Sequence, residues 1–327
     1  MKPEPLPVGV VGVGSHGSRH ARLYAEVPAA RLVGVYDIRP ERGAEIARDC
    51  RTVSYPSLER LLDDVEAVSV VVPTSAHLEV GLAALARGRH VLMEKPITAT
   101  VAEAEELVAA ADRAGVVLQT GHVERFNRAL RAAAPYLGKP VYVESDRVAP
   151  FHTRNLDVAV VLDLMIHDLD LVLTLIREPV TEVRASGIGV VSEHVDIASA
   201  RVEFASGAVA NLTASRLARD RVRKLRIFQP DGYFSLDLLE GKGDFLRLKP
   251  GGVAALLAGT GDIRSAVEQV RLKAPEAQPL VLELQSFVDT VRSGGQPAVS
   301  GRDGLAALAL AFRVLDAVAK QPVLRPS

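Results

Sequence analysis

Over the first 120 residues, short apolar runs alternate with longer stretches of mixed polarity. The runs are rich in Val, Leu and Ile and are continuously apolar, as is typical of strands buried on both faces. Between them, apolar positions recur at helical spacing. The pattern predicts strands at 8–13, 31–36, 67–72, 90–93 and 116–119, and helices at 18–26, 41–49, 77–87 and 101–114. This alternation predicts an α/β fold, a doubly wound parallel sheet with crossover helices.

The pattern changes after about residue 122. A helical segment at 157–176 is followed by β runs, several of them separated by turn signals, at 180–191, 198–204, 208–215, 222–228, 233–237 and 245–248, and then by helices at 280–292 and 304–320. We expect a C-terminal α+β domain at 122–327, with a large, mostly antiparallel open sheet, after the doubly wound α/β domain at 1–121. The Gly- and Ala-rich piece 249–261 is predicted to be a surface excursion. An uncovered sheet face favours self-association, as a homodimer or homotetramer.

A glycine motif stands where the first strand meets the first helix. Gly12 permits a tight turn, Gly14 lets the backbone approach a pyrophosphate, and Gly17 lets the helix pack closely on the strand. The helix N-terminus then offers unpaired N–H groups to the phosphates. Asp37 ends the second strand 20 residues after Gly17 (37 − 17) and can accept the ribose hydroxyls of NAD. Arg39 could offset part of the repulsion toward the 2′-phosphate of NADP, so NAD is favoured without excluding NADP. The alternative is a glycine turn that binds no nucleotide.

Composition narrows the classes of protein. Hydrophobic residues make up 48% of the 327 residues and charged residues 24%, which is ordinary for a soluble globular protein. The net charge of −1 gives no electrostatic reason to expect a nucleic acid or a membrane as partner. The single cysteine, Cys50, excludes an intrachain disulfide and suits a reducing compartment. With no apolar stretch long enough to span a membrane, we expect a cytoplasmic protein.

Two segments carry candidate chemistry. Lys95 follows a buried strand and precedes Pro96, which restricts it to an extended conformation at the strand end, suited to hydrogen bonding a substrate hydroxyl. Asp163, His167 and Asp170 are spaced to share one face of a helix, and His167 is the natural proton acceptor for an alcohol. Asp163 would orient the imidazole or pair with Lys95. The alternatives are a structural Lys95–Glu94 pair, a structural histidine, and a divalent-metal site, although hydride transfer to NAD needs no metal.

Basic residues concentrate between 216 and 226, where five arginines and one lysine occur. Arginine side chains bind the phosphates of nucleotide sugars well. A solvated strand face or a subunit interface is the favoured interpretation of such a run.

Taken together, these motifs resemble the glucose–fructose oxidoreductase/inositol dehydrogenase/MocA family over nearly the whole chain. The resemblance rests on the glycine motif, Asp37, the segments 73–77 and 94–96, Gly121-His122, the Asp163–His167 spacing and the segment 300–304. It implies a Rossmann domain and a Lys/Asp/His catalytic set at Lys95, Asp163 and His167. The expected cofactor contacts are Gly12, Gly14, Ser15, His16, Gly17, Asp37, Arg39, Pro73, Thr74, His77, Glu94 and Lys95. The expected substrate contacts are Lys95, Arg125, Asn127, Arg154, Asn155, Asp163 and His167.

Within the family, segments 121–127 and 162–170 resemble the UDP-N-acetylglucosamine 3-dehydrogenase group. Arg128, where proline is expected, is a departure from that group. The resemblance implies NAD-dependent oxidation of the sugar 3-hydroxyl to a ketone, which an aminotransferase converts to an amine en route to a 2,3-diamino sugar. A free polyol such as an inositol, or UDP-N-acetylglucosaminuronate, is the alternative substrate. A catalytically idle NAD-sensing regulator is the alternative of another class, and the intact Lys/Asp/His set argues against it.

Overall fold

The computed structural model describes residues 4–152, 158–259, 262 and 266–321. The chain forms two compact units. The first consists of residues 1–126 and 277–308, and the second of residues 127–276 and 309–327. The division into a dinucleotide-binding domain at 1–121 and a substrate-binding and oligomerisation domain at 122–327 stays a prediction. The compact units place the change at residue 127 and group a C-terminal segment with the first unit.

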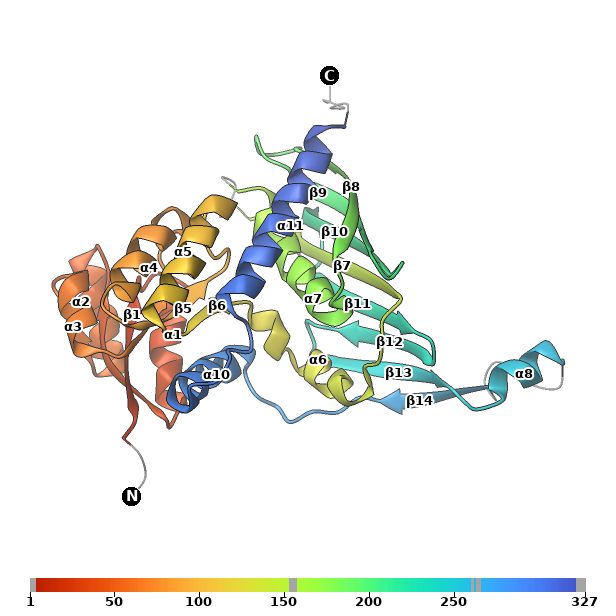
Figure 1. Ribbon diagram of the computed structural model, residues 1–327, viewed down its shortest axis with the longest axis horizontal. Helices are drawn as coiled ribbons and strands as arrows, with labels where there is room; N and C mark the ends of the chain where they lie inside the picture. Colours follow the sequence, from red (N-terminus) through yellow and green to blue (C-terminus); the bar gives the residue numbers. More distant parts are fainter. Residues whose placement is uncertain (1–3, 153–157, 260–261, 263–265, 322–327) are drawn as a thin grey trace. The chain divides into compact units, whose positions relative to one another are not determined.

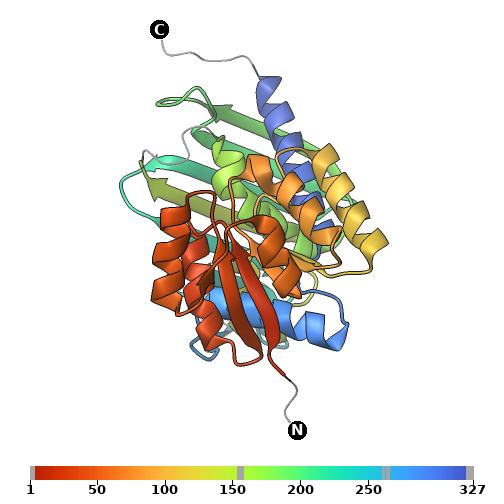
Figure 2. The same cartoon turned by 90° about the vertical axis from the view of Figure 1, so that its left-hand side faces the viewer.

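A six-stranded sheet with the order β3-β2-β1-β4-β5-β6 forms the centre of the first unit, and all of its pairs are parallel. Figure 2 shows helices on both sides of its red N-terminal strands. The strands are β1 (Leu6–Val11), β2 (Ala30–Tyr36), β3 (Val53–Ser54), β4 (Ala67–Val70), β5 (His90–Glu94) and β6 (Leu118–Gly121). The helices are α1 (Gly17–Leu23), η1 (Tyr24–Glu26), α2 (Pro40–Cys50), α3 (Leu58–Asp64), η2 (Thr74–Ala76), α4 (His77–Leu85), α5 (Val101–Ala114), η3 (Val123–Phe126) and α10 (Pro279–Ser293). The predicted doubly wound sheet is confirmed; α3 and the two-residue β3 were not predicted.

The helix α10 completes the core of the first unit. Its Leu284 and Phe287 are fully buried in one cluster with Val8, Val10 and Tyr24, which come from β1 and η1. Burial of apolar surface stabilises this packing by roughly 25 cal/mol per Å². The sequence pattern predicts the helix but gives no indication that it packs on strands more than 250 residues earlier in the chain.

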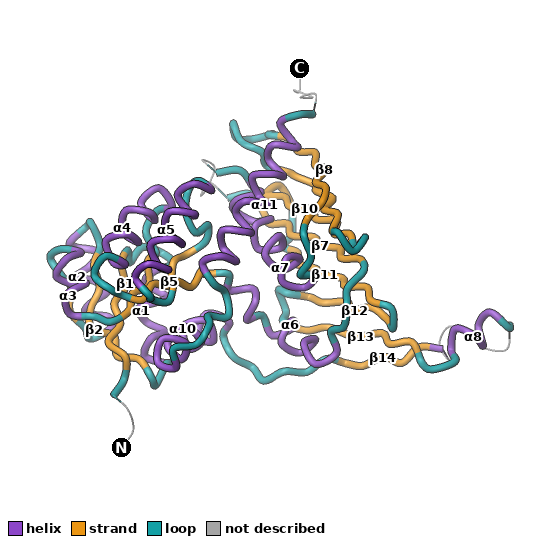
Figure 3. The backbone as a smooth tube through the Cα atoms, in the orientation of Figure 1, coloured by secondary structure: helices purple, strands orange, loops and turns teal. Residues whose placement is uncertain are grey.

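An eight-stranded sheet with the order β14-β13-β12-β11-β7-β10-β9-β8 forms the second unit (Figures 1 and 3). Its strands are β7 (Tyr142–Pro150), β8 (Val180–Ile188), β9 (Ile197–Phe204), β10 (Val209–Ala218), β11 (Val222–Gln229), β12 (Gly232–Asp237), β13 (Lys242–Leu248) and β14 (Val267–Arg271). Its helical elements are α6 (Arg128–Ala133), η4 (Ala134–Tyr136), η5 (Val161–Met165), α7 (Ile166–Ile176) and α8 (Gly252–Leu257). The helix α11 (Gly301–Ala319) contributes its first eight residues to the first unit and the remainder to the second.

The central strand β7 is the main element that sequence analysis missed. It pairs in parallel with β10 and antiparallel with β11, and every other pair in this sheet is antiparallel. The expectation of a mostly antiparallel sheet is therefore confirmed. The residues of β7 that face the core include Ser145 and Arg147 as well as Val143. The sequence of β7 therefore lacks the alternation of apolar and polar residues that predicts a half-buried strand.

The surface excursion 249–261 contains α8, and its last two residues lie outside the described residues. Helix α6 and strand β14 were not predicted. Within the part of the chain that the structure describes, no helix combines the length and the apolar character needed to cross a membrane.

Candidate functional site

The glycine turn has the backbone geometry that a dinucleotide needs. Gly12 has a φ of +82°, in the left-handed region, and a Cβ there would lie 2.7 Å from the carbonyl oxygen of Val71. A Cβ on Gly17 would lie 1.8 Å from the carbonyl oxygen of Gly12, so this position requires glycine. Beside Gly14, by contrast, no atom lies within 4 Å of a Cβ position. The open face at Gly14 is the space through which a pyrophosphate can reach the backbone, and the residues present therefore fit NAD.

Asp37 lies beside this turn. Its Oδ2 accepts a hydrogen bond from the backbone N–H of Val13 at 2.9 Å, and its Oδ1 accepts bonds from the backbone and side chain of Arg39 at 3.0 and 3.3 Å. The carboxyl group is almost fully buried. Because a carboxylate offers about four acceptor sites, these three bonds leave capacity for a ribose hydroxyl. Arg39 therefore contacts Asp37. This is the carboxylate whose repulsion toward the 2′-phosphate of NADP Arg39 was expected to offset in part.

Glu94, the last residue of β5, joins the glycine turn to the segment that carries Lys95. Its Oε1 lies 3.1 Å from Nε2 of His16 and 3.2 Å from Nε2 of His20, and its Oε2 accepts the N–H of Lys95 at 3.1 Å. Burial would raise the pKa of Glu94, but the two histidines outweigh burial and hold it well below its usual value. Burial lowers the pKa of His20, against the opposing pull of Glu94. A Cβ on Gly121 would lie 2.8 Å from Oε1, so the carboxylate packs directly on that backbone.

His77 fixes the other side of the Lys95 segment. Its Nδ1 lies 2.9 Å from the carbonyl oxygen of Pro96, and its Nε2 lies 3.0 Å from that of Val72. The imidazole therefore ties the end of β4 to the chain just after Lys95. Burial lowers the pKa of His77, although these carbonyl contacts oppose the effect. Lys95 is half-buried between these two anchors, Pro73 is exposed, and Thr74 is half-buried at the start of η2.

In the second unit, an ion pair anchors the helix that carries Asp163 and His167. Asp168 is buried and accepts two hydrogen bonds from the buried guanidinium of Arg147 on β7, at 2.7 and 2.9 Å. A bidentate arginine–carboxylate pair fixes both position and rotation. Asp168 is buried, whereas the neighbouring His167 is half-buried.

The helical segment predicted at about 157–176 is confirmed over 161–176, but it begins with a π turn rather than with α-helix. Residues 161–165 form a π turn, in which Asp163 lies, and α-helix follows from Ile166; residue 157 lies outside the described residues. Asp163 and His167 are both half-buried, whereas Asp170 is buried, so the three polar groups do not share one environment. π turns occur frequently at functional sites because they re-aim side chains. A catalytic role for Asp163 and His167 stays a prediction.

The other expected substrate contacts are placed as follows. Arg125 donates to the carbonyl oxygen of Ala298 at 3.1 Å and pairs with Asp303 at 3.3 Å, both within the first unit. Asn127 is the N-cap of α6: it accepts from the N–H of Ala129 and donates to the carbonyl oxygen of Leu238. Arg154 and Asn155 lie outside the described residues.

The basic run 216–226 spans the connection between β10 and β11, and several of its cations face acids. Arg216 is buried, pairs with Asp196 and donates to the carbonyl oxygen of Val158. Lys224 pairs with Asp237, and Arg226 pairs with Glu144. These pairs support the interpretation of the run as a strand face.

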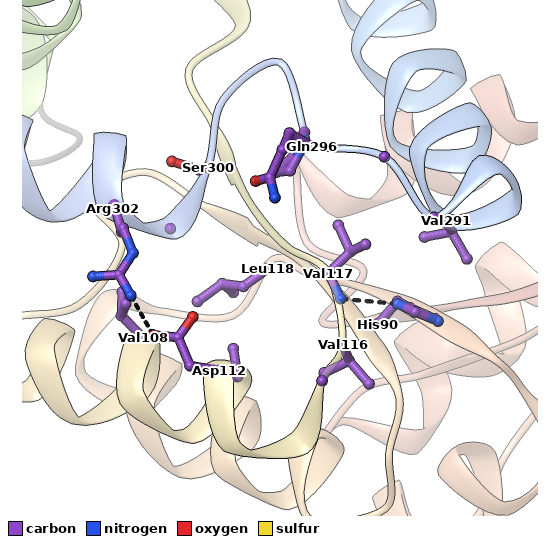
Figure 4. A pocket seen from close by; sticks show the side chains of 16 residues that line it. His90, Val108, Asp112, Val116, Val117, Leu118, Val291, Gln296, Ser300 and Arg302 are labelled. Atoms are coloured by element: carbon purple, nitrogen blue, oxygen red, sulfur yellow. Dashed lines mark hydrogen bonds and ion pairs between the residues drawn. The ribbon is translucent and has the colours of Figure 1, made fainter.

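A hollow of about 370 Å³ lies elsewhere in the first unit (Figure 4). It opens at the amino ends of β5 and β6, beside His90 and Val117, whose hydrogen bond is drawn in the figure. Lys95 and the glycine turn belong to the carboxyl ends of the strands, where ligands of doubly wound sheets bind. The hollow is therefore not part of the candidate nucleotide site.

Sequence analysis missed His20 and Arg147. The spacing of His20, four residues after His16 at the start of a helix, places both side chains on one face and was a usable signal. Arg147 gave no such signal, because its strand was not predicted.

Comparisons with known proteins agree with this geometry. Residues 6–122 match the family profile "Oxidoreductase family, NAD-binding Rossmann fold", and residues 131–235 match "GFO/IDH/MocA C-terminal domain". A UDP-N-acetylglucosamine 3-dehydrogenase from Acidithiobacillus ferrooxidans is 40% identical over 96% of this chain and 97% of that protein. A myo-inositol 2-dehydrogenase from Thermotoga maritima is 30% identical over 94% of each chain.

Solved structures show the same relationship. A structure of the Acidithiobacillus ferrooxidans enzyme covers 97% of this chain and 98% of its own, with a TM-score of 0.88 and 36% identity. Levoglucosan dehydrogenase in complex with NADH, at 18% identity and a TM-score of 0.85, shares the fold. From its glycine turn to its C-terminal sheet, the chain belongs to the GFO/IDH/MocA family of NAD-binding oxidoreductases, enzymes that act on CH–OH groups.

Proposed function

We propose that this oxidoreductase uses NAD to oxidise the 3-hydroxyl of UDP-N-acetylglucosamine to a ketone. The observation that carries the proposal is 40% identity, over 96% of the chain, to a UDP-N-acetylglucosamine 3-dehydrogenase. The glycine turn and Asp37 support the choice of cofactor. An aminotransferase would consume the ketone and yield a 2,3-diamino sugar.

The proposed roles follow from the chemistry of the side chains. His167 accepts the proton of the reacting hydroxyl, because its ordinary pKa lies near neutrality. Lys95 donates a hydrogen bond to the same oxygen and stabilises the negative charge that develops there. Asp163 orients the imidazole. NAD, when bound by the glycine turn and Asp37, supplies the hydride acceptor.

A free polyol is the second candidate substrate. Myo-inositol and scyllo-inositol 2-dehydrogenases are 30% and 28% identical to this chain over most of its length. The same Lys/Asp/His set would serve, since each substrate presents a secondary hydroxyl.

The substrate test is NADH formation, followed by absorbance, with UDP-N-acetylglucosamine, its 6-carboxylate and the inositols. Each substrate is assayed with and without an aminotransferase and glutamate, because removal of the ketone draws an uphill oxidation forward. We expect a signal with UDP-N-acetylglucosamine that the trap increases. Activity only on an inositol would show that a free polyol, and not UDP-N-acetylglucosamine, is the substrate. No activity on any of the tested compounds, despite NAD binding, would contradict the proposal.

We further propose that the chain forms a homodimer or homotetramer through the open face of its large sheet. Phe228 on β11 stacks with Tyr233 on β12 at 5.1 Å between ring centroids and contacts Tyr142 on β7 at 5.7 Å. All three are half-buried, and their neighbours Ile227 and Phe234 point into the core. Light scattering on the purified chain tests this: a monomer at micromolar concentration would contradict it.

A further inference from the structure

Three side chains of the first unit bring together donor atoms that suit a transition metal. Nε2 of His16, Nε2 of His20 and a carboxylate oxygen of Glu94 all lie within 4.8 Å of one another. His20 and Glu94 are buried, and only the side chain of His16, 45% exposed, reaches solvent. Two imidazoles and one carboxylate are a donor set that borderline cations such as Zn²⁺ and Co²⁺ prefer.

The distances fit a tetrahedral ion. Bonds of about 2.0–2.1 Å place neighbouring ligand atoms about 3.3 Å apart, and the two distances from Glu94 Oε1 to the histidines are 3.1 and 3.2 Å. The ligand atoms of the two imidazoles lie within 4.8 Å of each other, so the ion requires at most a small movement of one ring. That movement falls on His16, the exposed member, while the buried pair remains in place.

The orientation of His20 supports the same conclusion. Its Nε2 lies at ion-pair distance from Glu94 but without the alignment that a hydrogen bond needs. A ring nitrogen that ligates a metal points at the ion between the ligands rather than at the neighbouring oxygen. Glu94 can ligate through Oε1 and keep Oε2 on the N–H of Lys95.

We infer that His16, His20 and Glu94 form a binding site for one divalent transition-metal ion such as Zn²⁺, which cross-links the glycine turn to the end of β5. The site leaves a fourth coordination position for water on the side of His16. Binding stabilises the first unit, because the ion joins residues 78 positions apart that the unfolded chain does not hold together. Mg²⁺ and Ca²⁺ do not occupy the site, since hard cations prefer oxygen ligands.

The test measures metal binding by the full chain without a histidine tag, in the absence of NAD. Zn²⁺ affinity is determined by competition with a chromogenic chelator, and Co²⁺ provides the absorption spectrum of its coordination. We expect one site per chain and a tetrahedral Co²⁺ spectrum. His16→Asn removes a direct ligand and should lower Zn²⁺ affinity by more than the about 10- to 100-fold that loss of an outer-shell partner costs. Glu94→Gln is the second variant, and circular dichroism verifies that both are folded.

His194→Asn is the matched control, because His194 is an exposed histidine of the second unit. Its Zn²⁺ affinity should equal that of the wild type. The inference is overturned if the wild type binds no Zn²⁺ at 100-fold molar excess, if His16→Asn binds it as tightly, or if His194→Asn weakens binding equally. Because no substrate or cofactor enters the assay, its result is independent of the proposed function.

Discussion

The two units hold their candidate functional groups in different ways. In the first, the glycine turn is determined by backbone geometry: Gly12 and Gly17 stand where a Cβ would meet a carbonyl oxygen. In the second, the helix with Asp163 and His167 is held by a side-chain contact between Arg147 and Asp168. At Gly17 the constraint comes from the carbonyl of Gly12, five residues earlier (17 − 12), whereas the ion pair joins strand β7 to helix α7 through side chains. The nucleotide site can therefore be predicted from a short motif, whereas the anchoring of the helix that carries Asp163 and His167 cannot.

The largest effect is expected at the residues of the proposed mechanism. Lys95→Ala and His167→Ala should each lower kcat about 10²- to 10⁴-fold, the usual contribution of a positioned acid or base. Both variants should still bind NAD, as measured by calorimetry because the chain contains no tryptophan. Lys139→Ala and His194→Ala, at exposed positions, are the controls. Near-normal turnover of both Lys95→Ala and His167→Ala would contradict the proposed mechanism.

Removal of the Arg147–Asp168 ion pair in the second unit should have the next largest effect, which is a loss of stability. Arg147→Met leaves Asp168 buried without its partner, which costs about 3–5 kcal/mol of stability. The double variant Arg147→Met/Asp168→Leu should recover much of that loss, because neither charge then remains buried. Urea unfolding followed by circular dichroism measures both. The exposed pair Arg184–Glu182 supplies the control Arg184→Met, expected to be neutral. Equal stability of Arg147→Met and wild type would show that the pair does not anchor the helix.

Alanine substitutions at two glycines of the same turn should distinguish an effect on stability from an effect on NAD binding. Gly17→Ala introduces a methyl group onto the Gly12 carbonyl and should cost about 1–3 kcal/mol of stability. Gly14→Ala introduces one into open space, so its stability without NAD should equal that of the wild type while NAD affinity falls about tenfold, or about 1.4 kcal/mol. Thermal unfolding and calorimetric NAD titration together test the pair. If the two variants behave alike, the distinction between them is wrong.

The smallest effect is expected at the amino ends of the first unit's strands. His90 accepts the N–H of Val117 on Nδ1 and must be neutral to do so; burial lowers its pKa, and Glu66 opposes this. With the folded pKa below the unfolded value of about 6.5, its contribution to stability is complete above pH 6.5 and declines as the pH falls below it. The slope stays below about 1.4 kcal/mol per pH unit, because the side chain is only partly shielded from solvent.

Urea unfolding between pH 5 and 8 measures that slope, and His90→Gln should flatten it while leaving turnover at neutral pH unchanged. An equal slope in wild type and variant would assign the pH dependence to other groups.

Sequence patterns predicted most of this fold because its signals are local. Helix α5 was predicted at the bounds observed, since Thr100 and Glu103 form a capping box at its start and Gly115 ends it in the left-handed conformation. Strand β7 was missed because its inward residues include an arginine that becomes acceptable only when Asp168 meets it. The π turn was missed because the spacing of residues 161–165 is compatible with an ordinary helix.

By itself, the sequence determined the dinucleotide-binding turn, the parallel sheet around it, the antiparallel character of the second sheet and the family. Each of these rests on residue spacings that a chain encodes within about 30 positions. Only the tertiary structure decided that α10 completes the first core, that Arg147 anchors α7, and that Glu94 meets His16 and His20. These contacts join segments that are separate in the sequence, and their side chains become neighbours only after the strands are in register.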